Sequence, residues 1–177
     1  IRAPGTAPAI YHQSTYAPAD TAHRWMACSA MDHVGNIALG YSVSSGTVFP
    51  GVRYTGRLTS DPLGVMAQGE ASMIEGTGSQ TDSAARWGDY SSMNVDPVDD
   101  CTFWYTQEYY ATVSARDWHT RIGSFRFPNC SVGPQGAIAG QVTNAANSNP
   151  IVGARIDATL SPTQTFSAFS NPGGNYT

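Results

Sequence analysis

Residues 86–110 of the chain read RWGDYSSMNVDPVDDCTFWYTQEYY. Two runs of apolar, aromatic and β-branched residues flank a turn that contains Pro97 and three aspartates. Such a pattern predicts a β-hairpin with a loop of a few residues. The open end of this hairpin carries charged and aromatic residues, and Cys101 lies near its turn. The hairpin is therefore the unit from which both the fold and the candidate site are predicted.

The composition of the 177-residue chain predicts β structure. Glycine occurs 18 times and proline 11 times, aromatic residues make up 11% and charged residues only 12%. No stretch repeats apolar residues at helical spacing for long enough to indicate a helix, so an all-β fold is expected. The length suffices for one mid-sized domain or two small ones.

The charge pattern argues against two kinds of partner. All nine basic residues are arginines and the net charge is −4, so the chain lacks the basic surface that a nucleic-acid-binding protein needs. No apolar run approaches the roughly 20 residues of a membrane span. The sequence does not begin with a signal segment, as expected of either a processed secreted protein or an internal fragment.

The hairpin belongs to an internal repeat, because Arg24-Trp25 recurs 62 residues later as Arg86-Trp87. Strands are predicted at 10–16, 25–31, 37–43, 52–58 and 65–74, followed by three strands of the next unit. These four-stranded antiparallel meanders would amount to about two blades of a β-propeller. A propeller needs four or more blades, so the chain would be a piece of a larger protein or would close by self-association. A β-sandwich built from the same hairpins is the alternative.

The C-terminal part differs in character, and a domain boundary is predicted near residue 134, between regions 1–133 and 134–177. The second region contains Gly140-Gln141-Val142, Pro150-Ile151-Val152-Gly153-Ala154 and Gly173-Gly174-Asn175-Tyr176. These motifs resemble carboxypeptidase regulatory-like (transthyretin-like) domains, which implies a truncated, partial β-sandwich module. An incomplete sandwich would expose an edge that invites pairing with another chain.

The first region has a resemblance of its own. Its segments RWGDYSSM (86–93) and VDPVDDCTFWYT (95–106) are similar to sialidase-like, BNR-type propeller segments of secreted bacterial proteins. The resemblance implies a β-propeller segment that is extracellular and directed at carbohydrate. The Ser-x-Asp-x-Gly-x-x-Trp box of sialidases does not occur in this chain, so the resemblance implies a fold and a location more than a reaction.

Strand alternation places charged and aromatic residues at the open end of the repeat units. Asp89 and Glu108 end neighbouring strands, and a glycosidase uses two carboxylates about 5 to 10 Å apart. A sialidase would instead use a Tyr/Glu nucleophile pair and arginines that bind a substrate carboxylate bidentately. The predicted catalytic residues are Asp89, Glu108 and Tyr109, and the predicted substrate-binding residues are Arg24, Arg53, Arg86, Trp87, Tyr90 and Tyr110.

Structural roles compete with these functional ones. Arg24 and Arg86 recur in both units and would brace the blades, for example by pairing with Asp89. Whether the chain is an enzyme stays open, and a glycoside hydrolase is the class expected if it is one. The alternatives are a non-catalytic glycan-binding or adhesion module, whose aromatic side chains stack on sugars, and a scaffold segment without a ligand.

The three cysteines lack the spacing of a zinc site. Cys101 follows the hairpin turn and Cys130 follows the third strand, so both are expected at one end of the sheet, where a disulfide would leave Cys28 free. Three buried thiols are the alternative. A disulfide would fit an oxidising compartment and secretion.

The hairpin turn is acidic. Its residues Asp96, Asp99 and Asp100 could hold a calcium ion through oxygen ligands, or could form a solvated turn. No other metal or cofactor is predicted, since the four histidines show no metal-ligand spacing. Carbohydrate is the predicted partner.

Overall fold

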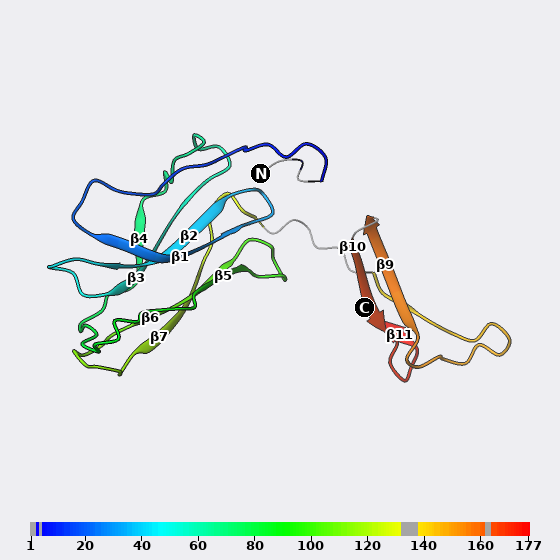
Figure 1. Ribbon diagram of the computed structural model, residues 1–177. Coiled ribbons are helices and arrows are strands. Elements are labelled where there is room, and N and C mark those ends of the chain that lie inside the picture. The colour runs from blue at the N-terminus through cyan, green and yellow to red at the C-terminus, as the bar shows by residue number, and fades with distance from the viewer. Residues whose placement is uncertain (1–2, 4, 132–137, 162–163) are drawn as a thin grey trace. The chain divides into compact units, whose positions relative to one another are not determined.

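The computed structural model describes residues 3, 5–131, 138–161 and 164–177. The chain divides into two compact units, 1–132 and 133–177 (Figure 1). The boundary predicted near residue 134 lies outside the described residues. Every regular secondary-structure element in the described residues is a β-strand, which confirms the all-β prediction. In this part of the chain no helix is long and apolar enough to cross a membrane.

The first unit begins with a four-stranded antiparallel sheet in meander order, as predicted. Its strands are β1 (His23–Met31), β2 (Ile37–Ser44), β3 (Gly51–Arg57) and β4 (Glu70–Ile74). Asp32 closes the β1–β2 turn, because its carboxylate accepts hydrogen bonds from the backbone N–H groups of Val34 and Asn36. Gly35 in the same turn has a φ of 89°, a conformation that glycine adopts without steric cost.

A three-stranded antiparallel sheet follows, again in meander order. Its strands are β5 (Ser92–Val95), β6 (Phe103–Tyr109) and β7 (His119–Phe125). Two aspartates close the β5–β6 turn. Asp96 accepts a hydrogen bond from the backbone of Val98, and Asp99 accepts hydrogen bonds from the backbone of Cys101 and Thr102. The hairpin predicted from residues 86–110 is present, with a first strand of only four residues.

Two predicted strands differ from the structure. Residues 10–16 form no strand, although the ring of Tyr16 packs 5.6 Å from the ring of Tyr41 on β2. The strand predicted at 65–74 begins only at Glu70. The residues before it form turns, and Gly69 has a φ of 74°, which is incompatible with an extended strand.

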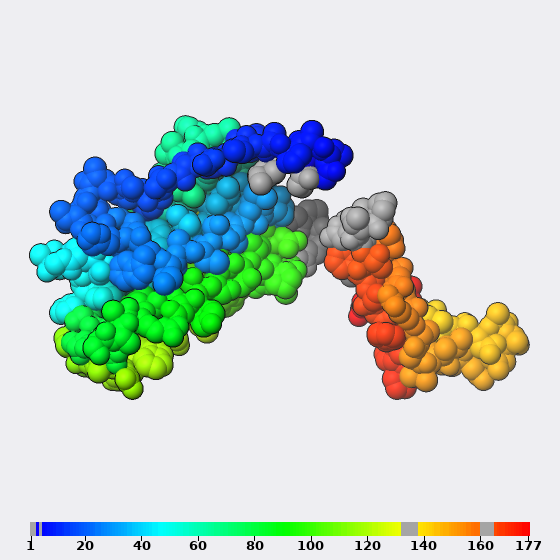
Figure 2. Space-filling model, viewed as in Figure 1, coloured from blue at the N-terminus to red at the C-terminus, as the bar shows by residue number. Residues whose placement is uncertain are grey.

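The two sheets pack face to face around one core (Figure 1). In the space-filling view, the blue and cyan residues of the first sheet lie directly against the green residues of the second (Figure 2). Ala38 and Val52 of the first sheet cluster with Met93 and Tyr105 of the second. Gly40 permits this close approach, because a Cβ atom at that position would lie 2.6 Å from the ring of Tyr105. Two neighbouring propeller blades and a β-sandwich have this face-to-face packing in common.

A disulfide joins Cys101 and Cys130, whose Cα atoms are 5.6 Å apart, and confirms the predicted pairing. It ties the β5–β6 turn to the segment that follows β7, and both cysteines are buried. Cys28 is a free cysteine on β1, as predicted. Its sulfur accepts a hydrogen bond from the backbone N–H of Met93 at 3.2 Å, so this thiol links the first sheet to β5.

The second unit contains two short antiparallel sheets. The strand β8 (Gly140–Gln141) pairs with β11 (Asn175–Tyr176), and β9 (Arg155–Ser161) pairs with β10 (Gln164–Phe169). Ser170 joins two segments of this unit, since its hydroxyl donates to the carbonyl of Ile151 at 2.6 Å and accepts from the backbone N–H of Ala154 at 2.9 Å. The arrangement is consistent with the predicted partial β-sandwich.

Candidate functional site

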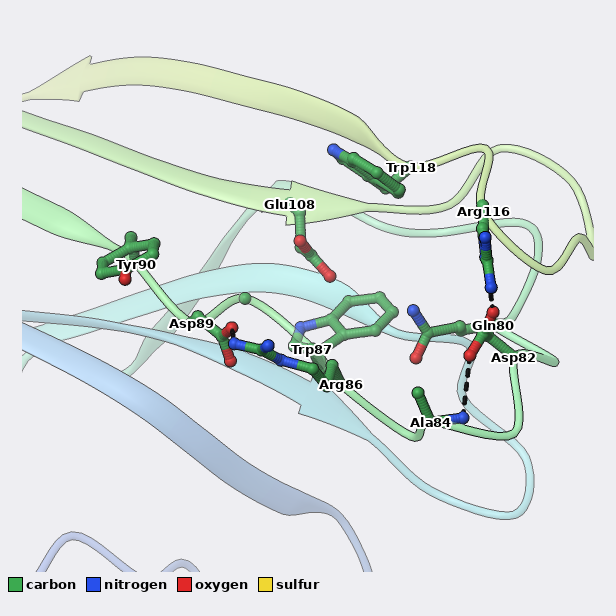
Figure 3. Close-up of a pocket in the computed structure, with 11 residues that line it drawn as sticks. Gln80, Asp82, Ala84, Arg86, Trp87, Asp89, Tyr90, Glu108, Arg116 and Trp118 are labelled. Carbon is green, nitrogen blue, oxygen red and sulfur yellow. Dashed lines mark hydrogen bonds and ion pairs between the residues drawn. The ribbon is translucent and has the colours of Figure 1, made fainter.

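A pocket of about 440 Å³ lies at the open end of the β5–β6 hairpin (Figure 3). Residues 80–90, the end of β6 and the loop before β7 form its walls. The charged residues that line it are Asp82, Arg86, Asp89, Glu108 and Arg116, and the aromatic ones are Trp87, Tyr90 and Trp118. The structure thus gathers five of the nine residues predicted to be catalytic or substrate-binding.

Strand alternation directs Glu108 into this pocket. The neighbouring residues Phe103, Tyr105 and Gln107 of β6 are buried, so Glu108 points to the opposite face of the strand. Figure 3 shows its side chain directed from β6 toward Trp87. Glu108 is only partly exposed to solvent at this position.

The environment of Glu108 favours its protonated form. Burial raises the pKa of the Glu108 carboxyl, and the nearby charge of Asp89 raises it further. A hydrogen bond from the backbone of Gly88 opposes these two effects without cancelling them. A carboxylic acid with a raised pKa in a pocket is a candidate functional group.

The indole of Trp87 is fixed by contacts with both sheets. Its Nε1–H donates to the hydroxyl of Ser42 at 3.0 Å, and its ring lies 6.0 Å from the ring of Trp25. On the side of the second sheet, its ring lies 5.4 Å from that of Tyr110. Trp87 is therefore a preorganised wall of the pocket.

Each arginine of the pocket is paired with a carboxylate. Arg86 forms an ion pair with Asp89, and Arg116 Nε lies 2.7 Å from Asp82 Oδ2. The hydrogen bond from Arg116 holds the pKa of Asp82 below its usual range. In the described part of the chain, Glu108 forms no ion pair with an arginine. Of the carboxyl groups that line the pocket, that of Glu108 is the one without an ion pair to a described arginine.

Two large aromatic side chains at the pocket are open to solvent. Trp118 is 54% exposed and Tyr90 is 92% exposed. Exposed aromatic rings beside a pocket offer apolar area and a polar edge to a ligand. Together with Trp87, they give the pocket aromatic surfaces on more than one side.

Arg24 and Arg53, both predicted to bind substrate, do not line this pocket. They bind Glu70 instead, from Arg24 Nε at 2.7 Å and from Arg53 Nη1 at 2.7 Å. The hydroxyl of Tyr41 donates to the same carboxylate at 2.6 Å. Burial alone would raise the pKa of Glu70, but hydrogen bonds from Arg24, Tyr41 and Arg53 lower it to about 2.

The remaining donors of these two arginines are also occupied. Arg24 donates to both carboxylate oxygens of Asp20, at 3.0 and 2.8 Å, and Arg53 donates to both oxygens of Glu75, at 2.8 and 2.9 Å. Guanidinium groups that are saturated by protein carboxylates brace the sheet. These contacts support the expectation that Arg24 has a bracing role in the sheet, and they assign the same role to Arg53.

The predicted residues Tyr109 and Tyr110 also lie outside the pocket lining. Tyr110 is fully buried, and its ring packs against that of Trp87. Tyr109 is turned to the opposite face of β6 from Glu108, and its ring lies 5.6 Å from that of His119. The pocket therefore does not bring Tyr109 and Glu108 together as a nucleophile pair.

One group of three metal-ligating side chains occurs within reach of a common ion among the described residues: His33, Cys101 and Cys130. The two sulfur atoms of this group are joined in the disulfide. In the acidic turn, Asp99 accepts three hydrogen bonds from the residues that follow it, two from Thr102 and one from Cys101. The calcium site at Asp96, Asp99 and Asp100 stays a prediction.

Three charged or aromatic residues of the pocket were not predicted from the sequence: Asp82, Arg116 and Trp118. Asp82 belongs to a polar loop, and Arg116 and Trp118 precede β7, where no repeat pattern singles them out. The sequence around Trp118 could have indicated an exposed tryptophan, because the adjacent charged residues Arg116 and Asp117 are poorly suited to a buried core.

Comparison of the chain with protein-family models, with curated proteins and with solved structures found no match. The sialidase-like and transthyretin-like resemblances therefore stay predictions, and the function is argued from the pocket.

Proposed function

We propose that the first unit binds carbohydrate in the pocket around Trp87 and Glu108. The observation that supports this most directly is the exposure of Trp118 and Tyr90 beside a partly buried carboxyl group. Sugar rings present apolar C–H faces flanked by hydroxyl groups. A binding pocket for them combines aromatic surfaces with a few fixed hydrogen-bonding groups, and this pocket has both.

The proposal includes an extracellular setting. The disulfide between Cys101 and Cys130 is compatible with an oxidising compartment, where secreted and cell-surface proteins fold. In this proposal the chain is a segment of a larger, secreted, carbohydrate-directed protein, in agreement with what the sialidase-like resemblance implies.

The proposal is tested with a glycan array followed by calorimetric titration of the strongest hit. Replacing Trp118 by alanine is expected to weaken binding about thirtyfold, because a central aromatic contact contributes about 2 kcal/mol. Trp104→Ala is the matched control, since Trp104 on β6 is 44% exposed, close to the 54% of Trp118, but does not line the pocket. No array hit, or equal losses in both variants, would contradict carbohydrate binding at this pocket.

Hydrolysis of a glycoside is a second candidate, favoured by the raised pKa of Glu108. A glycosidase needs one carboxyl group that stays protonated and one that is ionised. Glu108 would donate its proton to the leaving-group oxygen, while Asp89, held in its ion pair with Arg86, would act as base or nucleophile. Release of reducing ends by the wild type but not by Glu108→Gln, with binding retained in the variant, would establish it. Binding without turnover in the wild type would leave a glycan-binding module.

A further inference from the structure

The charged groups of the pocket carry information on the kind of sugar that fits it. If the ligand were an acidic sugar, the protein would need an arginine free to bind its carboxylate. Arg24 and Arg53 are saturated by carboxylates away from the pocket, and Arg86 and Arg116 are paired with Asp89 and Asp82. The charge of each of these arginines is therefore balanced by a protein carboxylate, and Glu108 leaves the charged side chains of the pocket with one more carboxyl group than arginines.

Among the charged residues that line the pocket, Glu108 is the one that forms no ion pair with a described residue. It reaches the pocket from β6, is partly buried, and has a backbone hydrogen bond from Gly88 as its partner in the pocket wall. A partly buried carboxylate without a cationic partner costs free energy, and a ligand cation would remove that cost. The second carboxylate nearby, that of Asp89, adds negative potential at the same place.

The aromatic side chains point to the same ligand charge. The faces of Trp87, Trp118 and Tyr90 carry negative electrostatic potential, which attracts a cation placed near them. An ammonium group seated beside Glu108 would thus meet a carboxylate and aromatic rings together. Figure 3 shows Glu108 directed into the space that Trp87 and Trp118 border.

We propose that the pocket selects a sugar with a free amino group, whose ammonium is bound by Glu108 and the neighbouring aromatic rings. This inference rests on the proposed carbohydrate binding and names the substrate class of that same site. It differs from the sialidase-like expectation, which requires an acidic sugar and free arginines. Neutral sugars would stack on the same rings but would leave Glu108 without a cation.

The test compares three β-1,4-linked tetrasaccharides that differ only at carbon 2: those of glucosamine, N-acetylglucosamine and glucose. Titration at pH 6, where an amino sugar is largely protonated, is expected to show about tenfold tighter binding of the glucosamine tetrasaccharide than of the other two. In Glu108→Gln this preference should fall below about twofold. Glu75→Gln is the control, since Glu75 carries the same charge but does not line the pocket, and it should keep the preference.

The outcomes separate the two proposals. Binding of the neutral or acetylated tetrasaccharide at equal or higher affinity overturns the amino-sugar inference and leaves carbohydrate binding in place. A preference for glucosamine that survives in Glu108→Gln also overturns the inference, because the charge would then act elsewhere. If none of the three binds and the glycan array is empty as well, both proposals are wrong.

Discussion

Glu70 is predicted to stabilise the first sheet through its hydrogen bonds with Arg24, Tyr41 and Arg53, three residues from three neighbouring strands. The variant Glu70→Gln keeps the shape of the side chain and removes its charge. The pKa of Glu70 falls from 4.5 to about 2, which corresponds to at most about 3 kcal/mol. Because the side chain is 17% exposed and partly screened by solvent, we expect a loss of about 2 kcal/mol at pH 7.

The pH dependence gives this prediction its sign. A carboxyl group whose pKa is lowered in the folded state stabilises the protein fully above its ordinary pKa, here 4.5. That stabilisation is lost as the pH falls through the folded-state value of about 2. Wild type and Glu70→Gln should therefore differ most at neutral pH and converge near pH 2.

Urea denaturation of both proteins between pH 2 and pH 7 measures this difference. Glu75→Gln is the matched control, because Glu75 is 44% exposed and pairs with a single arginine, so its loss should be below about 1 kcal/mol. The reasoning is refuted if Glu70→Gln loses no more stability than Glu75→Gln, or if its deficit stays constant down to pH 2.

Three further predictions concern other parts of the first unit. Replacing Cys101 and Cys130 by serine should lower the free energy of unfolding by about 3.6 kcal/mol, from the entropy of closing a 29-residue separation, as measured by denaturation under non-reducing conditions. Glu108→Gln should raise the melting temperature at pH 7 and have no effect at pH 3, because a raised pKa makes the ionised form unfavourable in the folded state. Gly40→Ala should lower the free energy of unfolding by about 1–3 kcal/mol, since its Cβ would overlap the ring of Tyr105, and an unchanged denaturation midpoint would contradict this.

Local patterns in the sequence were sufficient for the two meanders and the disulfide. The β1–β2 reversal is encoded within five residues, since Asp32 caps the turn and Gly35 supplies its positive φ. The strand predicted at 10–16 was wrong because no strand among the described residues pairs with this segment. A period-2 pattern indicates which face of a strand is buried, but it does not show whether a neighbouring strand exists.

The candidate site was only partly predictable. Period-2 alternation alone would have separated Glu108 from Tyr109, because consecutive residues of one strand face opposite sides. The binding of Arg24 and Arg53 by Glu70 depends on the register of strands that are distant in sequence, and no local pattern encodes it. Trp118 lies in the loop before β7, and neither strand periodicity nor the internal repeat predicts where a loop residue lies in the fold.

The covalent link between Cys101 and Cys130 also determines how the first unit would carry mechanical load. Tension applied through the chain beyond residue 130 passes from one sulfur to the other and bypasses β6 and β7. The 29-residue separation between the cysteines cannot extend, which shortens the length released on forced unfolding by about 100 Å. A pull from the C-terminal side therefore does not load β7 directly, and the force enters the second sheet at the turn that holds Cys101.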